Sequence, residues 1–149
     1  MRFLHTARIA APRAAVWSLV MDIPRVAACV PGAEAVTALA DDRYRGALRV
    51  QVGPIRVRLE GQIAIVDRDA DAGTASMRLD ASDTGGSGVT ATVALSLADV
   101  ADGTELRLDT DARILGRLGD LGQPIIKRKA DQIIGEFARN LERAAVTGS

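Results

Sequence analysis

The side chains best suited to chemistry are few in this sequence and stand apart from one another. His5 is the single histidine and Cys29 the single cysteine among 149 residues. Nucleophilic catalysis needs a nucleophile within reach of a positioned base, and no motif in the sequence pairs His5 with a serine or a cysteine. One histidine and one cysteine also cannot complete a structural zinc site. We therefore predict no catalytic residues and no metal ligands, and we interpret Cys29 as a small buried apolar residue.

Two short segments imitate ligand loops without completing them. The aspartates of Asp67–Asp71 are spaced like the start of a calcium loop. However, Ala72 and Arg78 stand where that loop needs a glycine and its closing glutamate. The glycine-rich segment Gly85–Gly88 has no following helix and no lysine, which a phosphate loop requires. We interpret the first segment as a solvated turn and the second as a mobile hairpin tip.

The composition excludes several classes of protein. Lys plus Arg and Asp plus Glu number 19 each, so no net field favours nucleic acid or an acidic substrate. A single cysteine cannot form an internal disulfide and is typical of a reducing cytoplasm. Arg2 and Arg8 interrupt any signal-peptide core, and no apolar run is long enough to span a bilayer. We expect a cytoplasmic protein.

The elements that must position any site follow from the spacing of apolar residues. Alternation predicts a strand over Arg2–Ala11, and Pro12 then opens a short helix that closes near Asp22. A second short helix begins at Ile23 and ends at the turn Pro31-Gly32. Six further strands are predicted after it. They are Glu34–Leu39, Arg43–Val52, Ile55–Ile65, Ala75–Ser82, Val89–Leu97 and Glu105–Asp109.

The chain ends in a long amphipathic helix, predicted over Pro124–Ala145 after a loosely held entry at Gly116–Gly122. Its apolar stripe is Ile126, Ala130, Ile133, Phe137 and Leu141. Strands joined by short turns are antiparallel, and each predicted strand has one apolar face that needs a cover. We predict one α+β domain over residues 1–149, a seven-stranded curved antiparallel sheet wrapped around the C-terminal helix.

The inward side chains of this sheet are small. They include Gly46, Gly61, Ala75, Ala81, Ala91 and Ala112, and the chain has only two phenylalanines, one tryptophan and one tyrosine. A curved sheet closed by one helix is either filled by large side chains or left partly hollow. We therefore predict a cavity, and we expect Gly61→Leu or Ala91→Leu to fill it with the fold intact. The predicted ligand-binding residues are Tyr44, Gly46, Leu48, Leu59, Gly61, Ile63, Met77, Leu79, Ala91, Val93, Leu108, Ile126, Ile133 and Phe137.

The order of strand, two short helices, six strands and a long helix resembles the helix-grip fold of the START and birch-allergen-like superfamily. Within it, the sequence resembles the family of the carbon monoxide dehydrogenase G subunit. The matching stretches are Ala11-Pro12, Val16-Trp17, Asp22, Cys29–Gly32, Val52–Pro54, Gly61, Gly116–Gly119, Phe137 and Leu141. The resemblance implies an accessory protein that helps to attach a molybdenum hydroxylase of the carbon monoxide dehydrogenase type to the inner face of the membrane.

Three hypotheses remain open from the sequence. The first, which we prefer, is a non-catalytic carrier that holds a hydrophobic small molecule, a quinone or a lipid, and needs no other cofactor. The second is a polyketide cyclase-like enzyme that uses the same cavity, although no set of His, Tyr and carboxylate residues is predicted inside it. The third is a docking module with a filled core. The basic segment Lys127–Lys129 and the arginines between Arg43 and Arg58 are candidate surfaces for an acidic partner or anionic lipid, and a solvated face is the preferred interpretation of the arginines.

Overall fold

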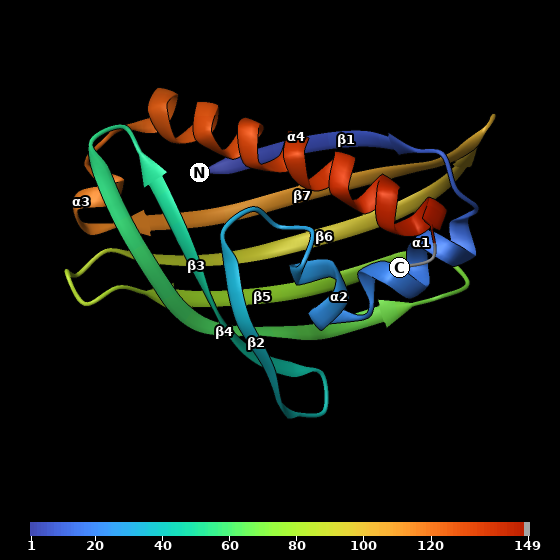
Figure 1. The fold of residues 1–149 in the computed structure, drawn as a ribbon, viewed down its shortest axis with the longest axis horizontal. Helices are drawn as coiled ribbons and strands as arrows, with labels where there is room; N and C mark the ends of the chain where they lie inside the picture. The colour runs from blue at the N-terminus through green and yellow to red at the C-terminus, as the bar shows by residue number, and fades with distance from the viewer. Residues whose placement is uncertain (148–149) are drawn as a thin grey trace.

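Residues 1–147 are described in the computed structural model, and they form one curved sheet around a long C-terminal helix (Figure 1). The order is β1 (Arg2–Ile9), α1 (Arg13–Val20), α2 (Ile23–Ala27), β2 (Ala33–Ala40), β3 (Arg43–Val52), β4 (Ile55–Asp69), β5 (Thr74–Ser82), β6 (Gly88–Val100), β7 (Gly103–Leu115), α3 (Gly116–Gly119) and α4 (Gln123–Thr147). The seven strands pair antiparallel in the order β1-β7-β6-β5-β4-β3-β2. The predicted α+β helix-grip fold is thus confirmed.

Three strands run further than the alternation predicts. β4 continues to Asp69 through a register shift between Ile65 and Asp67, so part of the predicted turn is strand. Val66 is 56% exposed and the residues after it are exposed as well. Where both faces meet water, the alternation disappears while the backbone ladder continues. β6 and β7 are longer than predicted, to Val100 and Leu115, and β7 carries the polar Thr110 at an inward position.

The two short helices begin where the sequence predicts. Pro12 stands in an extended conformation just before α1, whose buried residues are Val16, Leu19 and Val20. The Asp22 carboxylate accepts a hydrogen bond from the backbone N–H of Arg25 at 3.3 Å and so caps α2. Figure 1 shows α1 at the end of the sheet opposite α3, with α2 beside it nearer the middle.

The core is divided unequally along α4. The second half of the helix, with Phe137 and the fully buried Leu141, packs in one cluster with Ile9, Leu19 and Leu106. The first half contributes Ile126 to a much smaller cluster with Phe3, Ala91 and Ala112. The predicted stripe of α4 therefore faces the sheet along its length, but it meets dense packing only toward its C-terminal end.

The entry to α4 is held by the turn between β5 and β6. Ser87 is 1% exposed, and its Oγ accepts a hydrogen bond from the backbone N–H of Leu118 in α3 at 3.2 Å. The N–H of Ser87 donates to Oδ1 of Asp83 at 2.8 Å. Gly116 has a φ of +76°, and a Cβ there would lie 2.5 Å from the carbonyl oxygen of Gly86. The prediction of a mobile hairpin tip is wrong at Ser87, because this end of the turn is buried against α3.

Candidate ligand-binding cavity

The sheet and the first half of α4 border a partly open apolar space of about 290 Å³, which we call the α4 hollow. Its lining comes from β1, β3, β5, β6, β7, α3 and α4 and is almost entirely hydrophobic. The lining residues are Phe3, His5, Leu48, Val50, Val52, Leu79, Val89, Ala91, Val93, Thr110, Ala112, Ile114, Leu118, Ile126, Lys129, Ala130, Ile133 and Ile134. The space lies where the core clusters of α4 are thinnest.

A second apolar space of about 260 Å³, the α2 hollow, lies between α2 and the strongly bent strands β2 to β4. Its lining residues are Ile23, Val26, Ala27, Val30, Val36, Arg45, Gly46, Leu48, Leu59, Gly61, Gln62, Ile63, Leu79, Ala81 and Val89. Leu48, Leu79 and Val89 line both spaces. The two hollows are therefore neighbouring lobes that share the side chains of these three residues as their boundary.

Rows of small residues across the sheet explain why the space is open. Gly46 pairs with Gly61, and Gly61 with Ala81, so one row through three strands carries almost no side-chain volume. Ala91 pairs with Ala112 in a second row. Since a protein interior is otherwise packed as densely as an organic crystal, such rows leave room for a guest.

Gly61 has a structural role beyond its small size. A Cβ at this position would lie 1.9 Å from the carbonyl oxygen of Asp80 and 2.5 Å from Cα of Ala81. No side chain fits there unless β5 moves away from β4. The expectation that Gly61→Leu fills the cavity with the fold intact is therefore wrong, whereas Ala91 has a Cβ that already points at the α4 hollow.

The predicted ligand-binding residues separate into two groups. One group lines the hollows and consists of Gly46, Leu48, Leu59, Gly61, Ile63, Leu79, Ala91, Val93, Ile126 and Ile133. The other four lie in core clusters and line neither hollow. Leu108 and Phe137 pack at the α1 end, and Met77 and Tyr44 pack with Ile23 of α2. All four face inward, as the alternation predicts, but at places where helices α1, α2 and the second half of α4 fill the space.

The predicted ligand-binding residues include none of the lining residues that come from β1, β7 and α2, although Ala112 was expected among the small inward side chains. Phe3 and His5 on β1, and Thr110 and Ala112 on β7, share the inward face through the same alternation that identified the other strands. Val26 of α2 gave no such signal, because a helix of five residues has too few turns to define a face.

His5 is the polar residue whose surroundings the sequence least anticipated. Its Nε2 lies 2.7 Å from Oδ1 of Asp131 on α4, and its ring stacks on Phe3 with centroids 6.4 Å apart. Nδ1 is buried and has no hydrogen-bond partner among the described residues. A carboxylate thus orients the imidazole at the seam between β1 and α4. No serine, cysteine or carboxylate is among the described residues that line either hollow.

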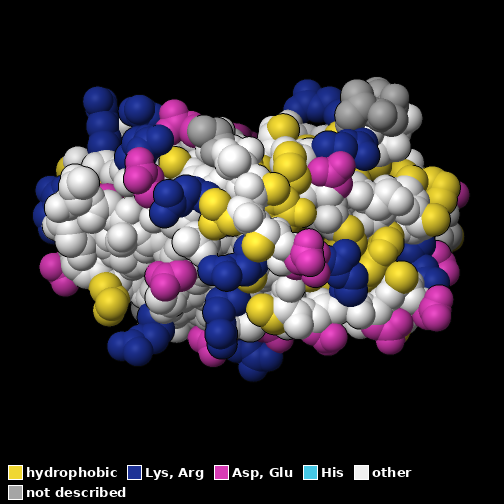
Figure 2. Space-filling view, turned by 90° about the horizontal axis from the view of Figure 1, so that it is seen from below, with side chains coloured by type: hydrophobic (Ala, Val, Ile, Leu, Met, Phe, Trp, Pro, Cys, Tyr) yellow, Lys and Arg dark blue, Asp and Glu magenta, His cyan; other side chains and the backbone are white. Residues whose placement is uncertain are grey.

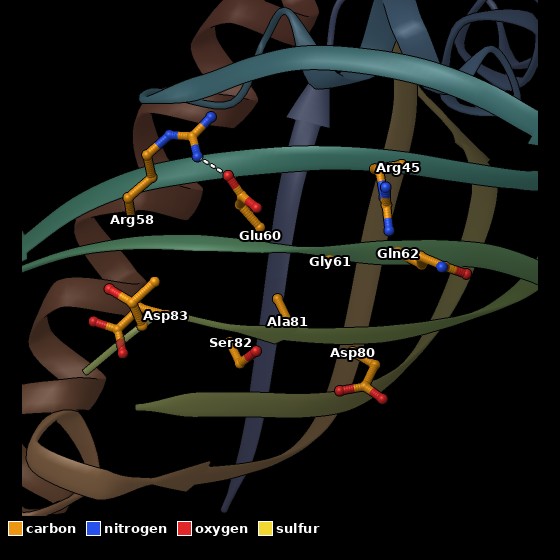
Figure 3. A pocket seen from close by; sticks show the side chains of 10 residues that line it. Arg45, Arg58, Glu60, Gly61, Gln62, Asp80, Ala81, Ser82 and Asp83 are labelled. Atoms are coloured by element: carbon orange, nitrogen blue, oxygen red, sulfur yellow. Dashed lines mark hydrogen bonds and ion pairs between the residues drawn. The ribbon is translucent and has the colours of Figure 1, made fainter. Parts of the chain in front are cut away.

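A larger depression of about 710 Å³ on the outer face of β3 to β5 is polar and open (Figure 3). Arg58 and Glu60, which line it, belong to a network of ion pairs. Arg58 donates to Glu60 and, at 3.0 Å, to Glu34, which also accepts from Arg49 at 3.0 Å. The hydrogen bonds from Arg58 and then Arg49 lower the pKa of Glu34. These ion pairs fit the interpretation of the arginines as a solvated face.

Figure 2 shows the face seen from below, on which Lys and Arg side chains alternate with Asp and Glu. Hydrophobic side chains gather over its centre and right half, and α1 lies at the right end in Figure 1. No large area of a single charge is visible in this view. Its mixed charge agrees with the balanced composition of the chain.

Neither a metal site nor a reactive thiol emerges from the described residues. No group of three His, Cys, Asp or Glu side chains within residues 1–147 could hold a metal ion. Cys29 is 5% exposed, and burial raises the pKa of its thiol. Among the described helices, none has the length and apolar character needed to cross a bilayer.

A long C-terminal helix gripped by a curved seven-stranded sheet defines the helix-grip fold. The family model for the G subunit of carbon monoxide dehydrogenase, CoxG, matches residues 6–146. The chain belongs to that family, and this confirms the resemblance seen in the sequence. No curated protein matches the chain.

Solved structures share the fold at low sequence identity. A conserved protein from Geobacillus kaustophilus has a TM-score of 0.90 at 17% identity, covering 99% of this chain and 96% of the other. The Zhui aromatase/cyclase from Streptomyces has a TM-score of 0.66 at 15% identity, with 97% and 93% covered. A START superfamily protein from Mycobacterium smegmatis has a TM-score of 0.65 at 15% identity, with 99% of both chains covered. These likenesses establish the fold alone.

Proposed function

We propose that this protein is a non-catalytic carrier that holds an apolar small molecule in the α4 hollow, with a quinone or a lipid as the preferred guest. The observation that carries the proposal is the pair of adjoining hollows lined by aliphatic side chains. Each Å² of apolar surface that a guest removes from water there favours binding by about 25 cal/mol. The volume of each lobe lies near the lower end of the range for ligand pockets, about 300–1,000 Å³. An isoprenoid or acyl chain that extends through both lobes fits such a shape.

Family membership supports the second part of the proposal, an accessory role in the carbon monoxide dehydrogenase system. The partner is then a molybdenum hydroxylase, and the carrier works beside it at the inner face of the membrane. Exposed hydrophobic residues at the α3 end, Leu115 and Ile125, lie close in sequence to exposed Lys127 and Arg128. Apolar side chains beside cations favour a peripheral contact with an anionic lipid surface.

The proposal is tested by a substitution on the sheet that fills part of the α4 hollow. Ala91 on β6 lines the α4 hollow, and Ala91→Leu adds three carbon atoms there. If a guest loses burial of about three CH₂ groups at roughly 0.8 kcal/mol each, its affinity falls about 50-fold. Ala94→Leu is the matched control, because Ala94 is exposed on the opposite face of the same strand.

The measurement has two parts. Mass spectrometry of an organic extract of the purified protein identifies a bound guest, and titration with a short-chain ubiquinone gives the affinity of each variant. We expect Ala91→Leu to lose both the guest and the affinity, and Ala94→Leu to keep them. Equal binding by wild type and Ala91→Leu would show that the guest sits elsewhere.

A polyketide cyclase-like enzyme remains the alternative, and the oriented imidazole of His5 is the observation that favours it. General acid–base catalysis of a cyclisation needs a positioned acid or base beside the reacting carbons, usually with a second group to take part. Among the described residues, the α4 hollow offers only Thr110 and Lys129 as further polar side chains. The carrier hypothesis needs no such group, and the structure supports it better.

A further inference from the structure

One polar atom in the apolar wall of the α4 hollow is left without a partner. Nδ1 of His5 is buried and makes no hydrogen bond among the described residues, although the ring lines the hollow. An unsatisfied buried polar group costs about 1–3 kcal/mol, so native proteins keep few of them without a reason. The neighbouring lining residues Phe3, Ile133 and Ile134 offer no hydrogen-bonding side-chain atom.

The contact of Nε2 on the other side of the ring determines whether Nδ1 donates or accepts a hydrogen bond. Nε2 lies 2.7 Å from Oδ1 of Asp131, and a carboxylate only accepts hydrogen bonds, so Nε2 carries the proton and donates. In the neutral imidazole Nδ1 then has a free lone pair and acts as an acceptor. The stack on Phe3, with 14° between the ring planes, limits rotation of the ring. Nδ1 is therefore an oriented acceptor, but neighbouring atoms cover it, so a guest hydroxyl reaches it only when the lining side chains move aside.

We propose, building on the carrier function, that His5 Nδ1 is the polar anchor of the site and accepts a hydrogen bond from a hydroxyl group at one end of an apolar guest. The chemical class is a phenol, a quinol or a long-chain alcohol. A guest whose polar end has only acceptors, such as an ether or a quinone carbonyl, still fills the hollow through its apolar body but gains no hydrogen bond from this ring. Asp131 is a positioning residue, since it touches the imidazole and does not line the hollow.

A pair of probes that differ only in the donor tests the anchor. 1-Naphthol and 1-methoxynaphthalene share an aromatic body, and only the naphthol carries an O–H. We expect wild type to bind the naphthol about fivefold to tenfold more tightly, which is the size of one net hydrogen bond. His5→Phe keeps a ring against Phe3 but removes the acceptor, so it should bind both probes with the affinity that wild type shows for the ether.

Asp131→Ala provides a second variant whose folding is not at risk, because the Asp131 side chain is 70% exposed. We expect it to reduce the preference for naphthol while the affinity for the ether stays unchanged. A spectroscopic signature accompanies this result. His5 is the only histidine, so its two ring nitrogens give unambiguous ¹⁵N NMR signals. The Nδ1 signal should shift with naphthol and stay in place with the ether.

The outcomes separate the anchor from the carrier function. If wild type binds both probes equally, the anchor is refuted and the carrier proposal stands. If wild type binds neither probe, the hollow is not a binding site for apolar molecules and both proposals fail. If Asp131→Ala keeps the full preference for naphthol, the positioning role of Asp131 is refuted.

Discussion

The close approach of β4 and β5 at Gly61 can be tested by adding a single methyl group. In Gly61→Ala the new Cβ would lie 1.9 Å from the carbonyl oxygen of Asp80 and 2.7 Å from Cβ of Ala81. Favourable carbon contacts lie at about 3.5–4.0 Å, so β5 must shift by roughly 1 Å or more. Overpacking of a dense region costs about 1–3 kcal/mol, and each strained ladder hydrogen bond adds about 1 kcal/mol. We expect Gly61→Ala to lower the free energy of unfolding by about 3 kcal/mol.

Two other glycines serve as controls for the loss of backbone flexibility. A Cβ on Gly135, inside α4, would lie 3.6 Å from Nη1 of Arg139, an ordinary contact. Gly135→Ala should therefore stabilise the protein by about 0.5–1 kcal/mol, the usual gain in a helix interior. In Gly46→Ala the new Cβ would be tightly placed against Cγ2 of Val36, at 3.1 Å, while the nearest backbone atom, the carbonyl oxygen of Glu34, lies at an ordinary 3.6 Å. A side chain yields more easily than a backbone. Gly46→Ala should therefore cost less than Gly61→Ala.

Urea unfolding measures all three variants, with the single tryptophan, Trp17, as the fluorescent probe. With a slope of about 2 kcal/mol per molar urea, Gly61→Ala should lower the unfolding midpoint by about 1.5 M. Gly135→Ala should raise it by a few tenths of a molar. If Gly61→Ala unfolds at the same urea concentration as wild type, the close approach of β4 and β5 at Gly61 is not what shapes the sheet.

Three other variants or reagents test the surface and the core. The double variant Lys127→Glu with Arg128→Glu should weaken flotation with anionic vesicles. The effect should be smaller at high salt, because the Debye length is about 8 Å at 0.15 M and shortens further as salt is added. Unchanged flotation would exclude this surface. Burial raises the pKa of the Cys29 thiol, so a maleimide should label it only as urea unfolds the chain, and rapid native labelling would contradict this. Arg58→Gln should raise the pKa of Glu34, whose lowering comes first from Arg58, as ¹³C NMR can measure. Because the pKa of Glu34 is lower in the folded chain than in the unfolded chain, its carboxylate stabilises the fold at pH values above the unfolded pKa. This stabilisation is lost as the pH falls through the folded pKa. Arg58→Gln should therefore lose less stability in acid than wild type.

The fold could be predicted because the sequence repeats one rule on every strand. Alternation identified each strand, and the step of three or four residues from Ile126 to Leu141 identified the final helix. The alternation disappears where neither face of a strand is buried. β4 runs on to Asp69, although both of its faces meet water there. Strand ends of this kind are fixed by the ladder with β5, which no local pattern records.

The site could be predicted only in part, because it depends on how the elements differ along their length. Inward positions such as Leu108 and Leu79 look alike in sequence, yet Leu108 lies in the dense core and Leu79 lines both hollows. The two positions differ in the half of α4 that covers them. The pairing of His5 with Asp131 spans 126 positions and joins the first strand to the last helix. No spacing motif can reveal a contact that the fold alone creates.

The hollow has two physical origins, and they have different meanings for function. At Gly61 the backbone leaves no room for a side chain, so its small size is a requirement of the sheet. Ala91 and Ala112 carry no such constraint, since each already points a Cβ into the α4 hollow. The α4 hollow is partly open, so a leucine at either alanine would bury new apolar surface there, at about 25 cal/mol for each Å² removed from water. The two alanines leave this stabilisation unused, which agrees with the proposal of a guest that fills the space.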